Sequence, residues 1–459
     1  MVAEVVEQRG GGRNPSTPGS PTGRERRPAE SEATQHTLLL MTHSPLTLTT
    51  RWSRVVPWCV PVLLAIVVAF WLSDHISRGF IDLEVYRIGI DTLRDGGDLY
   101  GDLPETSFGI GLPFIYPPFA ALALSPFALL PWSVAVVSYF TVSVAALALT
   151  LFLVARRMWP QQRALGWWAA ATALPLALLL EPTVSTLDFG QVNLILMGLV
   201  AADCLPEKTK WPRGVLVGIA AAIKLTPAAF VLYFLVRRDY KAAITAAATG
   251  ATVTALAFAV LPRESFEYWF GGGNMSGLSG SVFHTNQSIQ GVLARFGISG
   301  IAFTALWLVL AALALVLVYA IMRKVADVPP LALFANALLA LLVSPISWSH
   351  HWVWVAPGLL VLIAYAGRLP LRAAIAGYLV ALGAAWVFYY APHERLPQGE
   401  DRELGWSAAQ HLVGDAYVWV AVLLLGWIAL ARQAQRAVAE SEPVIRPDEV
   451  VAERSPTLR

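Results

Sequence analysis

Apolar runs follow one another from residue 55 to residue 431, separated by short polar segments. Each run is long enough to cross a bilayer or half of one, because a spanning helix needs about 20 apolar residues. The pattern predicts an all-α polytopic membrane protein. The runs lie at 55–73, 132–155, 164–180, 191–205, 214–236, 240–262, 299–322, 329–345, 352–367, 373–391 and 414–431.

Two stretches depart from a plain span. Residues 118–130 are short and bounded by Pro117, Pro118 and Pro131, which predicts a half-membrane or re-entrant helix. The run at 214–236 is broken at "KLTP", which predicts two short helices that meet near the outer side. With the broken run counted as two, we expect about twelve transmembrane helices and extracytoplasmic loops between them.

The ends of the chain differ in composition from the rest. Residues 1–50 are rich in Gly, Pro, Ser, Thr, Arg and Glu, a mixture that cannot bury a core. We expect a disordered cytosolic tail at 1–50, a transmembrane catalytic domain at 51–431 and a cytosolic tail at 432–459. Met41 is an alternative start of translation.

Composition agrees with this class. Of the 459 residues, 56% are hydrophobic and only 14% charged, against about 25% charged in ordinary soluble proteins, and the mean hydropathy is +0.57. The two cysteines, Cys59 and Cys204, lie inside or at the ends of apolar runs, so a disulfide framework is not expected.

Basic residues predict the orientation, because cytoplasmic loops of membrane proteins carry an excess of Lys and Arg. Placing every basic cluster in the cytosol puts both termini there and the loops at 74–117, 263–298 and 392–413 outside. The outer loops leave no room for a nucleotide-binding domain, and no Gly-rich phosphate loop is present. The clusters are Arg51/Arg54, Arg156/Arg157/Arg163, Lys208/Lys210/Arg213, Arg237/Arg238/Lys241, Arg323/Lys324, Arg368/Arg372 and Arg432/Arg436.

The segment "FIDLEVYR" after the first span carries Asp82, Glu84 and Arg87 among apolar residues. A solvated interfacial loop would explain these charges, but the apolar neighbours favour a segment held against the membrane or a core. A charge in hydrocarbon costs on the order of 3 kcal/mol, so carboxylates at that depth usually serve a function. A partly dry carboxylate also has a raised pKa, which suits a general base.

Other polar residues cluster at the same predicted face. In "EPTVSTLDFGQVN", Glu181 is expected to face the bundle interior, and Asp188 is equally explained as a helix cap. Lys224 in "AIKLTP" either snorkels to the surface or serves an anionic ligand at a broken helix. "FHTNQSIQGVLAR" and "SPISWSHHWVW" add further polar residues, and the Gly-rich loop at 270–281 is a linker or a lid. "YPPF" at 116–119 predicts only a helix start.

No metal-ligand spacing of the HxxxH or CxxC kind is present, so we expect no metal and no cofactor.

The ordered motifs "DLEVYR", "YPPF", "GQVN", "KLTP", "NQS" and "SPISWSHHW" resemble those of the polytopic GT-C glycosyltransferases, most closely glycosyltransferase family 87, over about residues 50–430. The resemblance implies inverting transfer of a sugar from a polyprenyl-phosphate donor to a glycolipid or lipoglycan hydroxyl at the outer face of the plasma membrane. Mannose and an α-1,2 linkage are expected, with arabinofuranose as the alternative sugar.

The resemblance also implies roles for the candidate residues. Asp82 is the general base. The expected partners are the lipid donor, the glycolipid acceptor and membrane lipids, with no nucleic acid. The candidates for the leaving phosphate are Lys224, His350, His351 and Arg87, and those for sugar and acceptor hydroxyls are Glu84, Glu181, Asp188, Gln191, Asn193, His284, Asn286 and Gln287.

A transporter or flippase remains the alternative of another class. It would also have many spans and intramembrane polar residues, but its polar residues should lie near the midplane between two similar halves. The sequence has no evident pair of similar halves, and its polar residues gather at one face.

Overall fold

The computed structural model describes residues 46–76, 79–271 and 281–441, and the side chains of this part between residues 57 and 435. Residues 1–45 of the predicted tail, the alternative start at Met41, the middle of the Gly-rich loop at 272–280 and the tail from 442 onward lie outside this description. The chain divides into two units after Val56, and the second, from Pro57 onward, contains all the described side chains.

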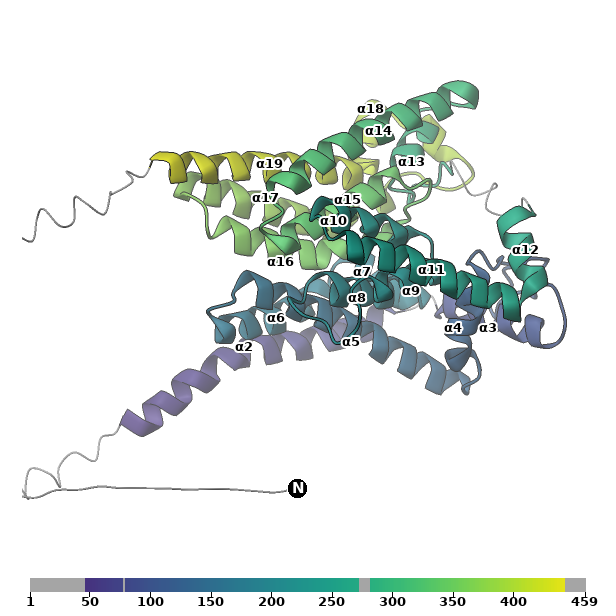
Figure 1. Cartoon of the computed structure of the whole chain (residues 1–459), viewed down its shortest axis with the longest axis horizontal. Coiled ribbons are helices and arrows are strands. Elements are labelled where there is room, and N and C mark those ends of the chain that lie inside the picture. The colour runs from purple at the N-terminus through teal and green to yellow at the C-terminus, as the bar shows by residue number, and fades with distance from the viewer. Residues whose placement is uncertain (1–45, 77–78, 272–280, 442–459) are drawn as a thin grey trace, which may run out of the picture. The chain divides into compact units, whose positions relative to one another are not determined.

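The described chain is built from helices (Figure 1). The helices of fifteen or more residues are α2 (Leu46–His75), α5 (Trp132–Met158), α6 (Arg163–Ala177), α11 (Tyr240–Val260), α14 (Gly300–Lys324), α15 (Pro329–Val343), α17 (Leu371–Tyr390) and α19 (Ala416–Ser441). The shorter ones are α3 (Ile81–Arg94), α4 (Pro118–Ala128), α7 (Glu181–Phe189), α8 (Asn193–Cys204), α9 (Val215–Ile223), η1 (Thr226–Phe230), α10 (Val231–Val236), α12 (Pro262–Phe270), α13 (Ile289–Arg295), η2 (Ser349–Trp354), α16 (Val355–Ala366), η3 (Pro392–Arg395), η4 (Arg402–Gly405) and α18 (Ala408–Gly414).

Among the described residues, seven helical segments are long and apolar enough to cross a membrane, and α6 with α7 forms an eighth, bent by 68°. The shorter apolar helices α4, α8, η1 with α10, and α15 fall below that length. Within the described residues the β pairing is confined to one isolated bridge, Asn286 with Trp348. The predicted polytopic all-α membrane protein is therefore confirmed, whereas helix length alone does not confirm twelve spans. The helices α2 and α19 also extend past the predicted domain boundaries at residues 51 and 431.

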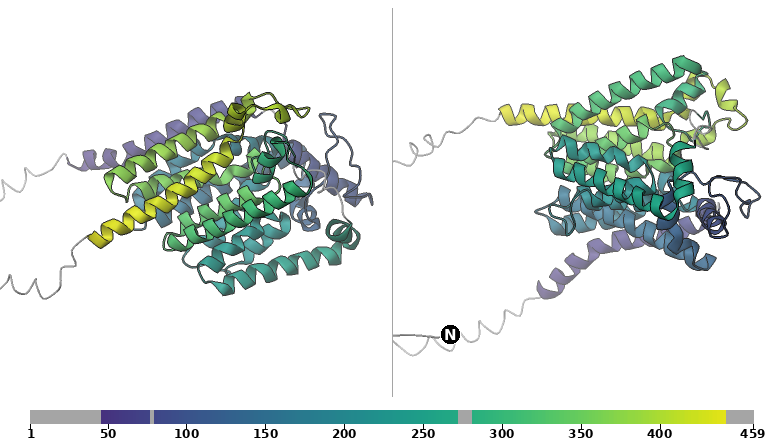
Figure 2. Two further views of the ribbon diagram at one scale, coloured as in Figure 1. Left: turned by 90° about the horizontal axis from the view of Figure 1, so that it is seen from above. Right: turned by 45° about the vertical axis from the view of Figure 1, so that its right-hand side comes forward.

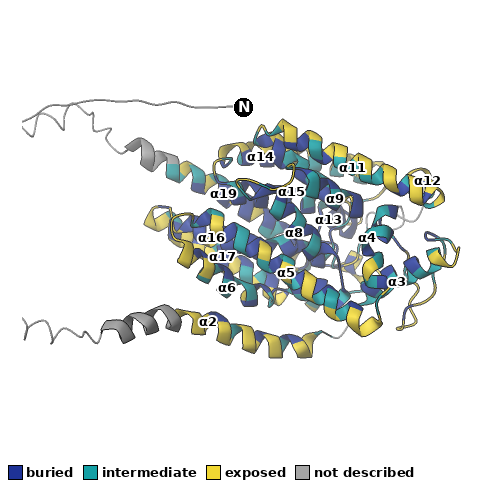
Figure 3. Ribbon diagram, turned by 60° about the horizontal axis from the view of Figure 1, so that its bottom comes forward, coloured by how far each residue is buried: buried dark blue, intermediate teal, exposed yellow. Residues whose placement is uncertain are grey.

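Burial separates a surrounding set of helices from a central one (Figure 3). Only 6% of the apolar window of α14 is buried, whereas the span formed by η2 and α16 is 78% buried. Exposed Leu, Val and Phe side chains cover α2, α14 and α17, as expected for surfaces that face lipid. The central helices α8, α15 and α16 form the core that holds the candidate site.

A short helix and a helix break occur where the sequence predicts departures from a plain span. The short helix α4 begins at Pro118, where the missing proline N–H has no intrahelical partner to lose. The run at 214–236 breaks after Ile223, Lys224 has an extended backbone, and η1 begins at Thr226.

Two arginines that contact opposite ends of α5 define the two ends of the helix bundle. Arg87 on α3 donates to the Leu130 carbonyl just before α5, and Arg368 donates to the Met158 carbonyl at its far end. The 27 residues of α5 separate these points by about 40 Å at 1.5 Å per residue. The short helices α3, α4, α12, α13 and α18 gather at the first of these ends (Figures 1 and 2).

Six of the seven basic clusters lie at the second end, near Met158. Each contacts another cluster or a residue close to one in the sequence, which agrees with the prediction that they share one side. The side chains of Arg51 and Arg54 are outside the description. The contacts are Arg157 with Glu207, Arg213 with Glu207 and Asp239, Arg237 with Ala326, Arg323 with Val236, Arg432 with Lys324, and Arg368 with Met158.

Candidate active site

The start of α3 is docked on the end of α7. The Phe80 N–H donates to the Asp188 carbonyl at 3.0 Å. Gly190 ends α7 with φ +73°, and a Cβ on it would lie 2.8 Å from the Leu83 Cβ, so this approach requires glycine. The contact places Asp82, in the first turn of α3, beside Gln191.

Two tyrosines orient Gln191 toward Asp82. The Tyr86 hydroxyl donates to the Tyr116 hydroxyl at 2.9 Å, and the Tyr116 hydroxyl donates to Gln191 Oε1 at 2.9 Å. Because the amide oxygen accepts from tyrosine, the amide N–H groups are available to Asp82, with which Gln191 forms a side-chain hydrogen bond. Tyr86 lies four residues after Asp82, so both project from one face of α3.

Lys224 reaches the same place from the break between α9 and η1. Its Nζ donates to Asn193 Oδ1 at 3.0 Å, at the start of α8. It also lies 3.3 Å from His351 Nε2 and 5.3 Å from the centre of the Tyr116 ring. The extended backbone at Lys224 turns its side chain away from the path of a continuous helix.

His351 is held in position through the backbone of its neighbour. The His350 carbonyl accepts from Thr186 Oγ1 on α7 at 2.6 Å and from Asn193 Nδ2 at 3.0 Å. These bonds fix η2 against α7 and α8, and they bring the half-buried His351 ring to Lys224.

These contacts define a polar cluster at one end of the core, made of Asp82, Tyr86, Tyr116, Gln191, Asn193, Lys224 and His351. Burial raises the pKa of the Asp82 carboxyl from 3.8 to about 6, while the Gln191 hydrogen bond and the Lys224 charge oppose the rise. A carboxylate with this pKa accepts a proton readily near neutral pH. Lys224 supplies positive charge for an anion nearby.

Two cavities share Glu394 in their lining, and His350, the chain neighbour of His351, lines one of them. The first, of about 620 Å³, is lined by Glu181 and Asp188 together with Trp71, Tyr389 and Tyr390. The second, of about 530 Å³, is lined by Phe189, His284, Trp348 and His350. Both volumes fall in the range of small-molecule sites, about 300–1,000 Å³. Four further sequence-predicted residues, Glu181, Asp188, His284 and His350, thus line the cavities.

Four predicted residues lie outside both the cluster and the cavities, and Glu84 and Arg87 are two of them. Glu84 accepts from the Ser107 N–H at 2.8 Å and from the Ser107 hydroxyl at 2.9 Å, so it holds the following loop. Arg87 donates to the Leu130 carbonyl at 3.3 Å and lies 3.7 Å from Asp91. Neither contact places these side chains in the cluster or the cavities, and their phosphate and sugar roles stay predictions.

Asn286 and Gln287 are fully buried and used for internal bonding. Asn286 Oδ1 accepts from Ser288 and from the Ser347 N–H. Gln287 Nε2 donates to the carbonyls of His284 and Gly414. With no exposed surface they cannot touch a sugar in this conformation, which departs from the role inferred for them from the sequence.

Sequence reasoning missed residues whose role depends on distant partners. Tyr116 belongs to the "YPPF" motif that predicts only a helix start, although its hydroxyl orients Gln191. Tyr86 is signalled only by its spacing from Asp82. His393 and Glu394 of η3 meet Glu181 of α7, and nothing in their local sequence indicates that contact.

Comparison with known proteins finds a family match and relatives that cover most of this chain. The model of glycosyltransferase family 87 matches residues 114–345. A polyprenol-phosphate-mannose-dependent α-(1-2)-phosphatidylinositol mannoside mannosyltransferase of Mycobacterium tuberculosis is 38% identical over 82% of this chain and 91% of its own. A protein of the same name from Mycolicibacterium smegmatis is 37% identical over 85% of this chain and 94% of its own.

A more distant relative carries the alternative sugar in its name. An α-(1→3)-arabinofuranosyltransferase of Mycobacterium tuberculosis is 25% identical over 58% of this chain and 63% of its own. The family resemblance inferred from the ordered motifs is confirmed by the family match and by relatives that cover most of the chain. The chain belongs to glycosyltransferase family 87.

Proposed function

We propose that this chain transfers mannose from a polyprenyl-phosphate mannose to a hydroxyl of a phosphatidylinositol mannoside, with an α-1,2 linkage. The observation that carries the proposal is that the charges of Asp82 and Lys224 lie close enough to interact. Gln191 forms a hydrogen bond with Asp82, and Asn193 accepts one from Lys224. A base and a cation side by side are what a single displacement from a lipid phosphate requires. The names of the two relatives that are 37–38% identical support the donor, the sugar and the acceptor.

In the proposed reaction Asp82 removes the proton from the acceptor hydroxyl. The oxygen forms a bond to the anomeric carbon while the bond from that carbon to the phosphate oxygen breaks. Polyprenyl phosphate leaves with the bonding electrons, the anomeric configuration inverts, and Asp82 ends protonated. The raised pKa of Asp82, about 6, favours this proton transfer near neutral pH.

Negative charge develops on the leaving phosphate, and fixed donors that face such charge lower the barrier. Lys224 supplies such donors, and His351 Nε2, 3.3 Å away, accepts from its ammonium and holds it in place. His350 packs its ring 4.8 Å from that of His351 and lines the second cavity, so it belongs to the same side of the site. An apolar pocket of about 50 Å³ between α8, η1 and α15 includes Asn193 and His351, and it suits the first part of the prenyl chain.

The acceptor glycan occupies the two cavities that share Glu394. Carboxylates of Glu181 and Asp188 accept bonds from sugar hydroxyls, and the aromatic rings of Trp71 and Tyr389 offer flat apolar surfaces to sugar rings. Tyr390 and Trp386 stack at 5.1 Å beside them.

We further propose that this site faces the outside of the plasma membrane and that both termini are cytosolic. The joining of six basic clusters at the opposite end supports this orientation. Counting α6, α8, α9, η1 with α10, and α15 as crossings beside the seven long helices gives twelve spans. Neighbouring helices cover these shorter crossings, so their backbone groups and limited length are tolerated.

The test uses purified protein in lipid nanodiscs. Radiolabelled polyprenyl-phosphate mannose and polyprenyl-phosphate arabinofuranose are supplied in parallel with phosphatidylinositol mannosides. We expect transfer from the mannose donor only, and release of the new sugar by an α-1,2-specific mannosidase. Transfer from the arabinose donor alone would assign the other sugar. A chain that consumes neither donor, although it is folded and supplied with acceptor, would contradict the proposal.

A further inference from the structure

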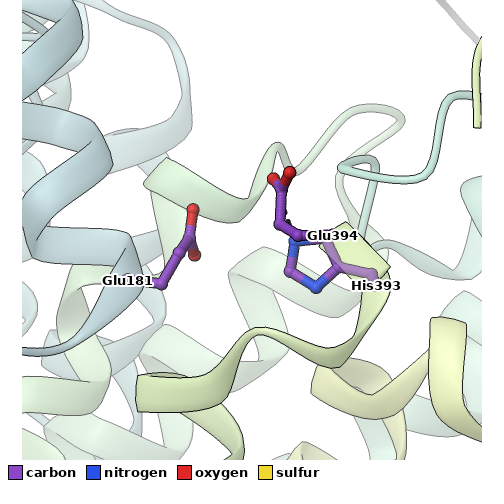
Figure 4. A group of neighbouring side chains, drawn as sticks. All are labelled: Glu181, His393 and Glu394. Carbon is purple, nitrogen blue, oxygen red and sulfur yellow. Dashed lines mark ion pairs between the residues drawn. The ribbon is translucent and has the colours of Figure 1, made fainter. Parts of the chain in front are cut away.

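We propose that Glu181, His393 and Glu394 form a binding site for a divalent cation, best suited to zinc. Figure 4 shows Glu181 on α7 facing the two neighbouring side chains of η3. One ligand atom from each residue lies within 4.8 Å of the others. The three belong to segments far apart in the sequence, which is why no spacing motif announces them.

His393 carries the argument, because it is a fully buried side chain without a hydrogen bond. Its exposed fraction is 0%, and neither ring nitrogen has a hydrogen-bond partner. Buried polar groups are normally paired, and an exception calls for an explanation. Nε2 is directed at Glu394 Oε1, 3.7 Å away, too far for a hydrogen bond. A metal ion between the two would satisfy the imidazole.

An imidazole ligates a metal through the lone pair of a ring nitrogen, and carboxylates ligate in their ionised form. Both ring nitrogens of His393 are without a hydrogen-bond partner, so either can serve as the ligand atom.

Neighbouring side chains hold both carboxylates in position, as is usual for carboxylates that bind a metal. Glu181 Oε1 accepts from the Ser349 hydroxyl and Oε2 from the Tyr417 hydroxyl, both at 2.8 Å. Glu394 Oε2 lies 3.5 Å from His284 Nε2. Such outer contacts orient the side chains that ligate a metal.

Electrostatics also favours a cation. Two carboxylates converge on an imidazole ring, and each repels the other. Arg395 lines the same cavity and is the competing positive charge, but its guanidinium lies over the Tyr390 ring at 5.2 Å. A divalent ion would neutralise both carboxylates from a position between them.

The donor set selects the class of metal. One imidazole nitrogen and two carboxylate oxygens suit Zn²⁺ or Mn²⁺ better than Mg²⁺ or Ca²⁺, which prefer oxygen alone. In a tetrahedral zinc site ligand atoms lie roughly 3.3 Å apart, given bonds of about 2.0–2.1 Å, so a small side-chain closure completes the geometry. The fourth position would open to the cavity that Glu181 and Glu394 line.

A cation here would join η3 to the first turn of α7. The opposite end of α7 leads into Gln191, so the site would stiffen the helix that positions the partner of Asp82. Its three ligands do not belong to the polar cluster that holds Lys224, which supplies the positive charge of the proposed transfer. The inferred site does not depend on the proposed function.

The test measures metal binding directly. Purified protein is stripped with a chelator, desalted and titrated with Zn²⁺ against a chromogenic chelator, and thermal unfolding is recorded with and without the ion. We expect about one zinc per chain and a higher unfolding temperature with zinc. His393→Gln and Glu181→Gln should each weaken binding by at least about 100-fold and remove the thermal shift.

His75→Ala is the matched control, because this exposed histidine lines the same cavity outside the group. It should bind zinc as the parent does. Both Gln variants keep the side-chain size, and gel filtration verifies their folding. Equal zinc retention by the parent and the His393→Gln/Glu181→Gln double variant would overturn the inference, as would no retention by the parent. Mannosyl transfer measured on the same samples reports on the proposed function separately.

Discussion

The Lys224 ammonium lies between Asn193 Oδ1, at 3.0 Å, and His351 Nε2, at 3.3 Å. Both contacts come from segments that His350 ties together, because its carbonyl accepts from Thr186 and Asn193. A lysine at a helix break is thus held beside the polar cluster. The substitutions expected to slow transfer are therefore those that remove Lys224 or the side chains that hold it.

Lys224→Ala should slow single-turnover transfer from the lipid donor by about 10- to 150-fold. A hydrogen bond to a charged group contributes roughly 1.5–3 kcal/mol, and the leaving phosphate loses that bond. His351→Ala should show a similar loss. Lys224→Arg should recover only part of the rate, because a planar guanidinium is larger and differently directed.

Lys208→Ala provides the control for Lys224, because this lysine is exposed among the basic clusters at the other end. It should transfer at the parental rate. Single turnover with excess EDTA should also proceed, since side chains supply the charge, while the chelator lowers thermal stability through the inferred cation site. Loss of transfer in EDTA that a divalent cation restores would assign the leaving group to a metal instead.

Asp82→Asn should reduce transfer by at least about 100-fold, the usual scale of general-base catalysis. Asparagine keeps the shape and can still bond to Gln191, so expression and donor binding should persist. Asp95→Asn, at the exposed end of the same helix, is the control. If Asp82→Asn turned over normally, the base would have to be sought among Glu181 and Asp188.

The pH dependence of transfer should follow the Asp82 carboxyl. Its pKa of about 6 means that the proton acceptor is ionised above this pH and protonated below it. The rate at low substrate concentration should therefore rise with pH and level off above 6, with about a tenfold deficit at pH 5 relative to pH 7. Asp82→Asn should lack this acidic limb in its residual rate. A parental profile flat between pH 5 and 7 would remove Asp82 from the base role.

Local signals were sufficient for part of this site. "KLTP" contains a proline that interrupts the helix, so the position of Lys224 at a break could be predicted. "DFGQVN" contains a glycine that ends α7 with positive φ, so a turn before Gln191 was equally readable. Proline and glycine act on their own backbone, so their effects can be predicted without knowledge of the fold.

Partnerships across the fold could not be predicted in this way. Arg87 stands five residues after Asp82, yet it turns to the Leu130 carbonyl, because helical geometry places it on another face. Asn286 and Gln287 resemble sugar ligands by type, but the packing of η2 and α18 consumes their polar atoms. Which polar side chain meets a cavity depends on contacts that no sequence spacing encodes.

Orientation can be tested by cysteine labelling. In a Cys59→Ser background, which removes the exposed native thiol, Glu400→Cys should react with an impermeant thiol reagent on intact cells. Glu400 is 87% exposed and lies in a loop predicted to be outside. Lys208→Cys should react only after permeabilisation. Reversal of these two patterns would invert the membrane orientation and exclude an extracytoplasmic site.

Gln287→Ala separates a structural role from a sugar-binding role. The side chain bridges the His284 and Gly414 carbonyls, at 2.8 and 2.7 Å, and accepts from the Tyr417 N–H at 3.3 Å. Its removal leaves buried backbone groups unpaired, at about 1–3 kcal/mol each. We expect a clearly lower unfolding temperature, little change in the acceptor KM at temperatures where the variant is folded, and no effect in the exposed control Gln161→Ala. A raised acceptor KM at unchanged thermal stability would instead make Gln287 a ligand of the acceptor, and it would require the loop at 283–287 to open during binding.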